Sequence, residues 1–78
     1  MPQFTLEIAI KHSQEDAEKM VEDLANQGVQ AYYAPLRSPT RLIYRVRRGI
    51  YPSEDLARRD AAELKARKKL QVKVIKLN

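Results

Sequence analysis

The chain has 78 residues, a length that predicts one domain, residues 1–78, with a single thin core. It contains no cysteine, which excludes disulfides and thiolate metal sites, and its one histidine, His12, is not enough for a metal site. Fifteen Lys and Arg residues against ten Asp and Glu residues give a net charge of +5, which favours an anionic partner.

The first predicted element is a strand over residues 4–11, where apolar and polar residues alternate. Because strand side chains alternate between two faces, the apolar residues are expected to enter the core together. These core-facing residues are Phe4, Leu6, Ile8 and Ile10. The residues expected on the opposite face are Thr5, Glu7, Ala9 and Lys11.

A helix is predicted next, beginning at Ser13. A serine followed by acidic residues is typical of a helix N-terminus, because the hydroxyl caps the backbone and the acids suit the helix dipole. Apolar residues then recur at spacings of three and four, as on one face of a helix. They are Ala17, Met20, Val21 and Leu24. Gly28 is well placed to end this helix.

The two middle strands are predicted over residues 29–34 and 42–51, joined by a turn-rich link at 37–40. Pro35 is expected to end the first of them or to mark it as an edge strand. In the second, one face is apolar and suits the core, with Leu42, Tyr44 and Val46. The other face carries Ile43, Arg45 and Arg47.

A second helix begins with another serine cap, Ser53, and a fourth strand is predicted over residues 71–77. The apolar stripe of this helix consists of Leu56, Ala57, Ala61 and Leu64. Its last turn is basic, which suits the negative end of the helix dipole, with Lys65, Arg67, Lys68 and Lys69.

The predicted fold is α+β, with the element order βαββαβ. A weak repeat supports it, because a shift of forty residues places Ser13 on Ser53 and Leu24 on Leu64. Two such halves form a ferredoxin-like (RNP-like) four-stranded antiparallel sheet with two helices on one face. The first and third strands are expected at the centre. The helices are expected to cover Leu6, Ile8, Tyr44, Val46, Val72 and Val74.

The opposite face of the sheet is expected to stay uncovered, since an antiparallel sheet can keep one face in water. It is predicted to hold the candidate ligand-binding residues Glu7, Ala9, Tyr32, Ile43, Arg45, Arg47, Lys73 and Ile75. Guanidinium groups bind carboxylates or phosphates, and exposed isoleucines suit a flat, partly apolar ligand. The alternative is a solvated face on which Glu7 pairs with Arg45 or Arg47.

Catalysis is not expected, because the chain lacks a nucleophile beside an oriented base, and both clear serines are helix caps. No cofactor is expected, since only two glycines occur and no phosphate-binding loop is present. No apolar run is long enough to span a membrane, and this segment contains no charged-then-apolar leader.

A nucleic-acid-binding module of RNP-like fold is an alternative that the basic charge favours. However, such modules stack bases on aromatic side chains of the two central strands, and the outward positions predicted there are not aromatic. A third possibility is protein interaction through an edge strand, because the second and fourth strands have unpaired backbone groups.

The stretch Tyr44-Arg45-Val46-Arg47-Arg48-Gly49-Ile50-Tyr51, followed by an alanine-containing helix, resembles the third-strand segment of the SPOR (sporulation-related repeat) family. The serine-initiated first helix and the passage from Leu24 to Gly28 and Val29 also resemble that family. The resemblance covers almost the whole chain and implies the βαββαβ fold.

The resemblance implies a domain that binds peptidoglycan glycan strands stripped of their stem peptides. We expect this domain to be non-catalytic and monomeric. The resemblance also implies a place in the cell envelope at the division site, where the domain targets its parent protein. Carried over to this chain, the ligand surface includes the third-strand arginine Arg45 and the hydrophobic positions Ile43 and Ile75. Glu7 stands where the family usually has glutamine, and Ile43 stands where it often has an aromatic residue.

Overall fold

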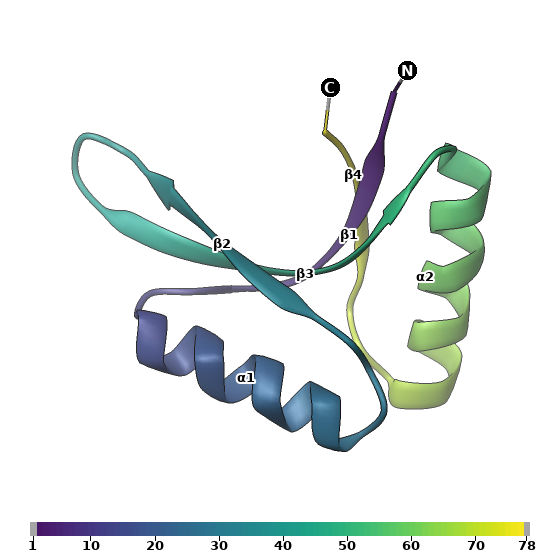
Figure 1. The fold of residues 1–78 in the computed structure, drawn as a ribbon, viewed down its shortest axis with the longest axis horizontal. Coiled ribbons are helices and arrows are strands. Elements are labelled where there is room, and N and C mark those ends of the chain that lie inside the picture. The colour runs from purple at the N-terminus through teal and green to yellow at the C-terminus, as the bar shows by residue number, and fades with distance from the viewer. Residues whose placement is uncertain (1, 78) are drawn as a thin grey trace.

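A computed structural model describes residues 2–77 of the chain. Its elements follow the predicted order: β1 (Phe4–Lys11), α1 (Gln14–Asn26), β2 (Tyr32–Arg37), β3 (Leu42–Tyr51), α2 (Glu54–Lys68) and β4 (Lys73–Lys76). The strands form one antiparallel sheet in the order β2-β3-β1-β4, so β1 and β3 are central (Figure 1). The predicted α+β, ferredoxin-like fold is confirmed.

Both helices begin at the serines that the sequence marks as caps. The Ser13 hydroxyl accepts a hydrogen bond from the backbone N–H of Asp16 at 3.1 Å. The Ser53 hydroxyl accepts one from the N–H of Leu56 at 3.3 Å. Each bond satisfies a backbone donor that has no partner within its helix, so the two caps define where α1 and α2 begin.

The end of α1 is a Schellman motif. The N–H of Val29 donates to the carbonyl of Leu24 at 2.8 Å, and the N–H of Gly28 donates to the carbonyl of Ala25 at 3.0 Å. Gly28 has a φ of 82°, the left-handed conformation that this motif requires. The predicted helix end is therefore confirmed, and the motif brings Val29 into the core beside Leu24.

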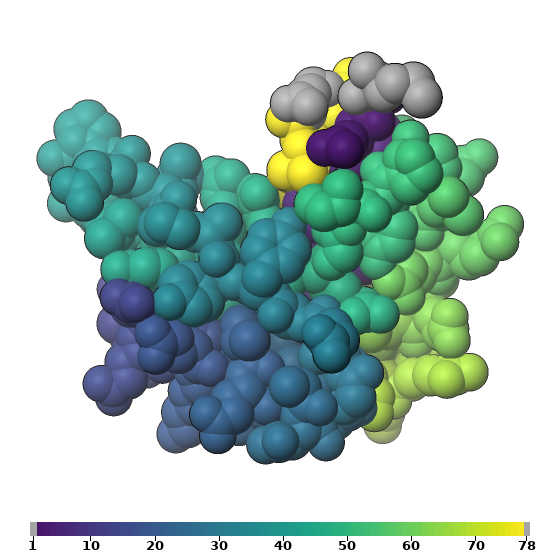
Figure 2. Space-filling view, in the orientation of Figure 1, coloured from purple at the N-terminus to yellow at the C-terminus, as the bar shows by residue number. Residues whose placement is uncertain are grey.

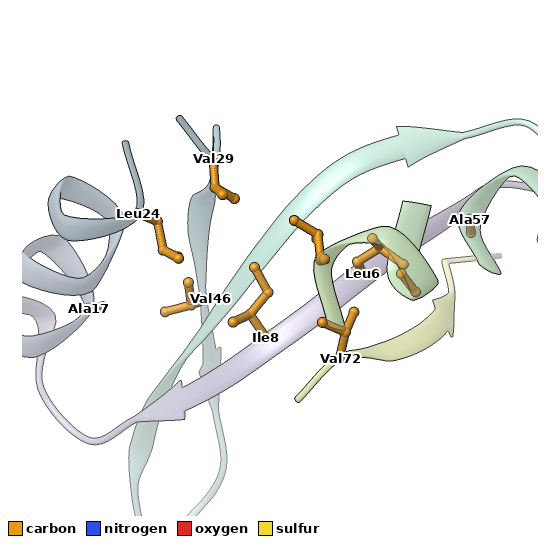
Figure 3. Packing of buried hydrophobic residues seen from close by; sticks show 10 residues of the cluster. Leu6, Ile8, Ala17, Leu24, Val29, Val46, Ala57 and Val72 are labelled. Carbon is orange, nitrogen blue, oxygen red and sulfur yellow. The ribbon is translucent and has the colours of Figure 1, made fainter. Parts of the chain in front are cut away.

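The core lies between the two helices and one face of the sheet (Figure 3). Small side chains on the helices, such as Ala17 and Ala57, let them approach the strands closely. The buried hydrophobic residues are Leu6, Ile8, Ala17, Leu24, Val29, Val46, Ala57, Ala61, Leu64 and Val72. The other face of the sheet is left without a covering helix (Figure 1).

Two strand boundaries differ from the prediction. The second strand runs over Tyr32–Arg37 rather than 29–34, and Pro35 lies within it, opposite Tyr44 of β3. A proline is tolerated there because β2 is an edge strand, and its missing N–H need not serve an outer neighbour. The fourth strand covers Lys73–Lys76 rather than 71–77, although Val72 is still buried.

A β-bulge in β1 corrects the predicted faces of that strand. Glu7 lies opposite Arg47 and Ala9 lies opposite Val46, so β1 advances two residues while β3 advances one. An extra residue on one strand reverses the alternation of every side chain beyond it. The predicted alternation is therefore valid only up to this bulge.

The reversal moves three residues to the face opposite to that predicted. Ile10, which was expected in the core, lies opposite Arg45 and is 48% exposed. Ala9, which was expected on the uncovered face, packs against the core cluster. Lys11 lies opposite Tyr44, a residue of the core side. The alternating pattern of the sequence does not mark the bulge, so the prediction for these residues was wrong.

A second irregularity lies in β3 near Gly49. Phe4 pairs with Tyr51 and Leu6 pairs with Arg48, so β3 contains one residue more than β1 between these pairs. Gly49 has a φ of 72°, and a Cβ atom there would lie 2.7 Å from the Tyr51 ring. Glycine is required for both reasons.

Within residues 2–77, no helix is long and apolar enough to cross a membrane.

Candidate functional site

The uncovered face of the sheet gathers side chains from all four strands, and we call it the open face. Strand register assigns its members, because directly paired residues point to the same side of a sheet. They are Thr5, Glu7, Ile10, Tyr32, Ala34, Leu36, Ile43, Arg45, Arg47, Lys73 and Ile75. Figure 2 shows the molecule hollowed between the β2–β3 hairpin and the paired ends of β1 and β4.

One row of polar residues crosses the whole sheet. Tyr32 of β2 pairs with Arg47 of β3, Arg47 pairs with Glu7 of β1, and Glu7 pairs with Lys73 of β4. Because each pair is directly opposite in register, the four side chains lie side by side across the face. Two cations therefore flank the one carboxylate of this row.

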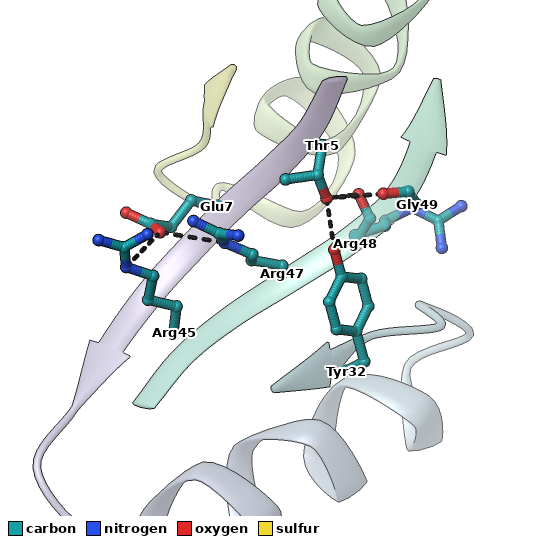
Figure 4. A network of polar contacts seen from close by, with 7 residues as sticks. All are labelled: Thr5, Glu7, Tyr32, Arg45, Arg47, Arg48 and Gly49. Carbon is teal, nitrogen blue, oxygen red and sulfur yellow. Dashed lines mark hydrogen bonds and ion pairs between the residues drawn. The ribbon is translucent and has the colours of Figure 1, made fainter. Parts of the chain in front are cut away.

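Glu7 binds both central arginines (Figure 4). Its Oε1 lies 3.3 Å from Nε of Arg47, which donates a hydrogen bond to it, and 3.7 Å from Nε of Arg45. The Arg47 side chain is only 9% exposed and that of Glu7 13%, whereas that of Arg45 is 33% exposed. The arrangement matches the pairing that the sequence left open, and only Arg45 presents much of its guanidinium to solvent.

Thr5 and Tyr32 form a second polar contact across the sheet (Figure 4). Thr5 is completely buried, and its hydroxyl donates to the carbonyl of Gly49 at 2.6 Å. The carbonyl of Arg48 lies 3.2 Å from the same hydroxyl. The hydroxyl of Tyr32 lies 2.8 Å from Thr5 Oγ1. Tyr32 is thereby held against the sheet, which leaves its ring unavailable as a mobile stacking group.

The apolar part of the open face is larger than the sequence predicts. Ile43 and Ile75 lie there as expected, and Ile10 and Leu36 join them. Leu36 was missed because the strand was predicted to stop at residue 34, although the alternation of Ala34 and Leu36 would have indicated it. Ile10 was missed because a bulge has no signature in the alternating pattern.

A groove of about 630 Å³ adjoins the open face at the edge of β1. It runs between the C-terminal half of β1 and the segment that leads from α2 into β4. Its lining residues are Glu7, Ile8, Ala9, Ile10, Lys65, Leu70, Gln71, Val72 and Lys73. The groove therefore shares Glu7, Ile10 and Lys73 with the open face.

The polar cluster on the helix side of the sheet has a structural role. Asp60 of α2 accepts hydrogen bonds from Tyr51 and from Arg48 of β3, and Arg48 also donates to the carbonyl of Gln30 at 2.8 Å. Burial, and then the hydrogen bond and negative charge of Asp60, raise the pKa of Tyr51 to about 12, while Arg48 acts in the opposite direction. The cluster joins α2 to the sheet.

The family model of the SPOR domain matches residues 2–76. The chain belongs to the SPOR domain family. No curated protein matches this SPOR domain at a significant level.

Two solved structures share the fold of this SPOR domain. One is the solution structure of the peptidoglycan binding domain of the B. subtilis cell wall lytic enzyme CwlC, with 19% identity and a TM-score of 0.77. The alignment covers 100% of this chain and 92% of that one. The other is the crystal structure of the RlpA SPOR domain from Pseudomonas aeruginosa, with 16% identity and a TM-score of 0.69, covering 92% and 96% of the two chains.

Of the residues that the sequence predicts to bind ligand, all except Ala9 lie on the open face of this SPOR domain. Ala9 instead lines the adjoining groove and packs against the core. Within residues 2–77, no cluster of three or more His, Asp and Glu side chains is arranged to hold a metal ion. What the open face offers chemically is aliphatic surface, one partly exposed guanidinium and the ammonium group of Lys73.

Proposed function

We propose that this SPOR domain binds peptidoglycan glycan strands, stripped of their stem peptides, through its open face. The observation that carries the proposal is the composition of that face, where aliphatic side chains surround the partly exposed Arg45. Apolar faces of sugar rings can lie on aliphatic carbon, and guanidinium N–H groups donate to hydroxyls and carboxylates. The family and the peptidoglycan binding domain of CwlC, a neighbour in fold, support this ligand class.

The proposed contact residues are those of the open face together with its groove. Ile43 and Ile75 contact sugar rings, Arg45 and Lys73 donate to polar groups of the glycan, and Tyr32 borders the site. The proposed roles of Glu7 and Arg47 differ, because their side chains are mostly buried in an ion pair. Each exposed ionic contact contributes only about 0–1 kcal/mol, so we expect modest affinity and dependence on several contacts at once.

Cosedimentation with purified peptidoglycan sacculi tests this function. The double variant Ile43→Ala, Arg45→Ala is expected to lose most of the binding seen with the unaltered domain. The matched control is Leu56→Ala, Arg59→Ala, which removes an exposed aliphatic and an exposed basic side chain from α2. Equal binding by the site variant and the control would reject the open face as the ligand surface.

The proposed biological role is to direct a parent protein to the cell wall at the division site, acting as a non-catalytic monomer. A fluorescent fusion of the parent protein in dividing cells is expected to gather at the septum. The same fusion with Ile43→Ala, Arg45→Ala is expected to spread along the envelope. Septal accumulation of the double variant would show that another part of the parent protein directs it.

Nucleic-acid binding is the second candidate, which the net charge of +5 favours. Against it, the open-face side chains that β1 and β3 contribute among residues 2–77 include no aromatic ring on which a base could stack. The side chain of Tyr32, on the edge strand β2, is engaged by Thr5. A mobility shift with RNA that weakens as salt rises, without binding to sacculi, would favour this candidate over the first.

A further inference from the structure

Two arginines at the centre of an exposed sheet would ordinarily form a site for anions, because guanidinium groups bind carboxylates and phosphates well. On this open face that position is already occupied. Oε1 of Glu7 lies 3.3 Å from Nε of Arg47 and 3.7 Å from Nε of Arg45. The carboxylate is supplied by the chain itself, directly opposite Arg47 in the strand register.

We infer that Glu7 sets the charge selectivity of the open face, so that its centre accepts a hydroxyl group of a sugar and disfavours densely sulfated or phosphorylated polymers. The inference rests on the proposed function, because it assigns a ligand class to the same face. It concerns the residue at one position of this chain and does not depend on which glycan is bound.

Hydrogen-bonding chemistry supports this assignment. A sugar hydroxyl is both a donor and an acceptor, so one hydroxyl can donate to the Glu7 carboxylate while it accepts from Arg45. A sulfate or phosphate group is only an acceptor and carries negative charge. At the same position it would meet the carboxylate of Glu7 without a proton to share, and like charges at close range repel.

Burial opposes any movement of the Glu7 side chain away from Arg47. The side chains of Glu7 and Arg47 are 13% and 9% exposed, so separating them would leave two mostly buried charges without partners. An anionic ligand therefore cannot easily displace Glu7 from Arg47. Arg45, which is the more exposed of the two arginines, remains the one that can turn toward a ligand.

The test compares two soluble probes, chitohexaose as the uncharged glycan and a heparin-derived hexasaccharide as the sulfated glycan, by titration calorimetry. Glu7→Gln keeps the shape of the side chain and removes its charge. We expect this variant to gain about tenfold affinity for the sulfated probe, a change on the scale of one charge-assisted contact. The binding of this variant to the sulfated probe should also depend more strongly on salt, by the amount expected for about one additional ion pair. The affinity of the variant for chitohexaose should rise by a smaller factor than its affinity for the sulfated probe.

Two controls separate local from global charge. Glu22→Gln changes the net charge equally but lies exposed on α1, away from the open face, and should leave both affinities unchanged. Adding Arg45→Ala to Glu7→Gln should reverse the gain for the sulfated probe. An equal gain in the Glu22 variant, or no gain in Glu7→Gln, would overturn the inference.

The remaining outcomes are also decisive. If the unaltered domain binds neither sacculi nor chitohexaose but Glu7→Gln still gains affinity for the sulfated probe, the proposed function fails and the role of Glu7 stands. If Glu7→Gln does not fold, the unaltered domain is compared directly with both probes at physiological salt. Tighter binding of the sulfated probe would then overturn the inference, and equal or tighter binding of chitohexaose would support it.

Discussion

The hydroxyl of Tyr32 on β2 lies 2.8 Å from the hydroxyl of Thr5 on β1, although β3 runs between these two strands. Thr5 has one hydroxyl proton, and it donates this proton to the carbonyl of Gly49 at 2.6 Å. Tyr32 must therefore be the donor in its contact with Thr5. One buried side chain thus links three strands at the irregularity in β3, where regular backbone pairing is interrupted.

Replacing Thr5 by valine should destabilise the domain by about 1–3 kcal/mol, because the partly buried carbonyl of Gly49 and the Tyr32 hydroxyl both lose their partner. Tyr32→Phe should cost less, about 0.5–1.5 kcal/mol, since Thr5 can still donate to Gly49. Urea denaturation measures both. Tyr33→Phe is the control, because the Tyr33 hydroxyl makes exposed contacts only. Similar losses for Thr5→Val and Tyr33→Phe would contradict the role given to Thr5.

Alanine at Gly49 should be far more costly than alanine at Gly28, although both glycines have a positive φ. The left-handed conformation alone costs a non-glycine residue about 1–2 kcal/mol. At Gly28 a Cβ atom meets nothing within 4 Å, whereas at Gly49 it would lie 2.7 Å from the Tyr51 ring. Overpacking adds about 1–3 kcal/mol at Gly49. Equal losses of unfolding free energy in the two variants would show that the ring moves aside freely.

The stability of the domain should fall as the pH rises from about 10 to about 12, because of Tyr51. Its pKa is about 12 in the folded chain against 10.0 for an ordinary tyrosine. In this interval the unfolded chain loses the proton that the folded chain retains, so unfolding becomes more favourable with rising pH. Tyrosinate absorbance should show one late-titrating group that Tyr51→Phe abolishes. The same late titration in that variant would assign it to another tyrosine.

The bulge in β1 predicts opposite behaviour for two similar residues. Ile8→Ala should destabilise the domain by about 2–4 kcal/mol, because Ile8 belongs to the buried core. Ile10→Ala should cost less than about 1 kcal/mol, since Ile10 is exposed, and it should weaken binding to sacculi. Thermal unfolding and cosedimentation measure the two effects. If Ile10→Ala proves as destabilising as Ile8→Ala, the side-chain alternation of β1 is not reversed at the bulge.

Much of the open face follows from residue alternation. Ile43, Arg45 and Arg47 of β3 lie on the face that the sequence predicts, since β3 is regular over these residues. Lys73 and Ile75 of β4 do so as well. The prediction is wrong for Ala9 and Ile10, which follow the bulge in β1. The sequence left open whether the arginines are free or paired with Glu7, because Glu7 is forty residues from Arg47 along the chain and lies directly opposite it only in the sheet.

The central place of β1 and β3 could be predicted from the βαββαβ order, which is typical of one sheet topology. The element order, both serine caps and the glycine that ends α1 could be predicted from the sequence alone. These features depend on neighbouring residues, whose patterns act locally. The three-dimensional structure was needed to find the two register irregularities, the burial of Thr5 and the pairing of Glu7 with both arginines. Those features depend on how separate strands align, because the best register satisfies packing and hydrogen bonding across the whole sheet at once.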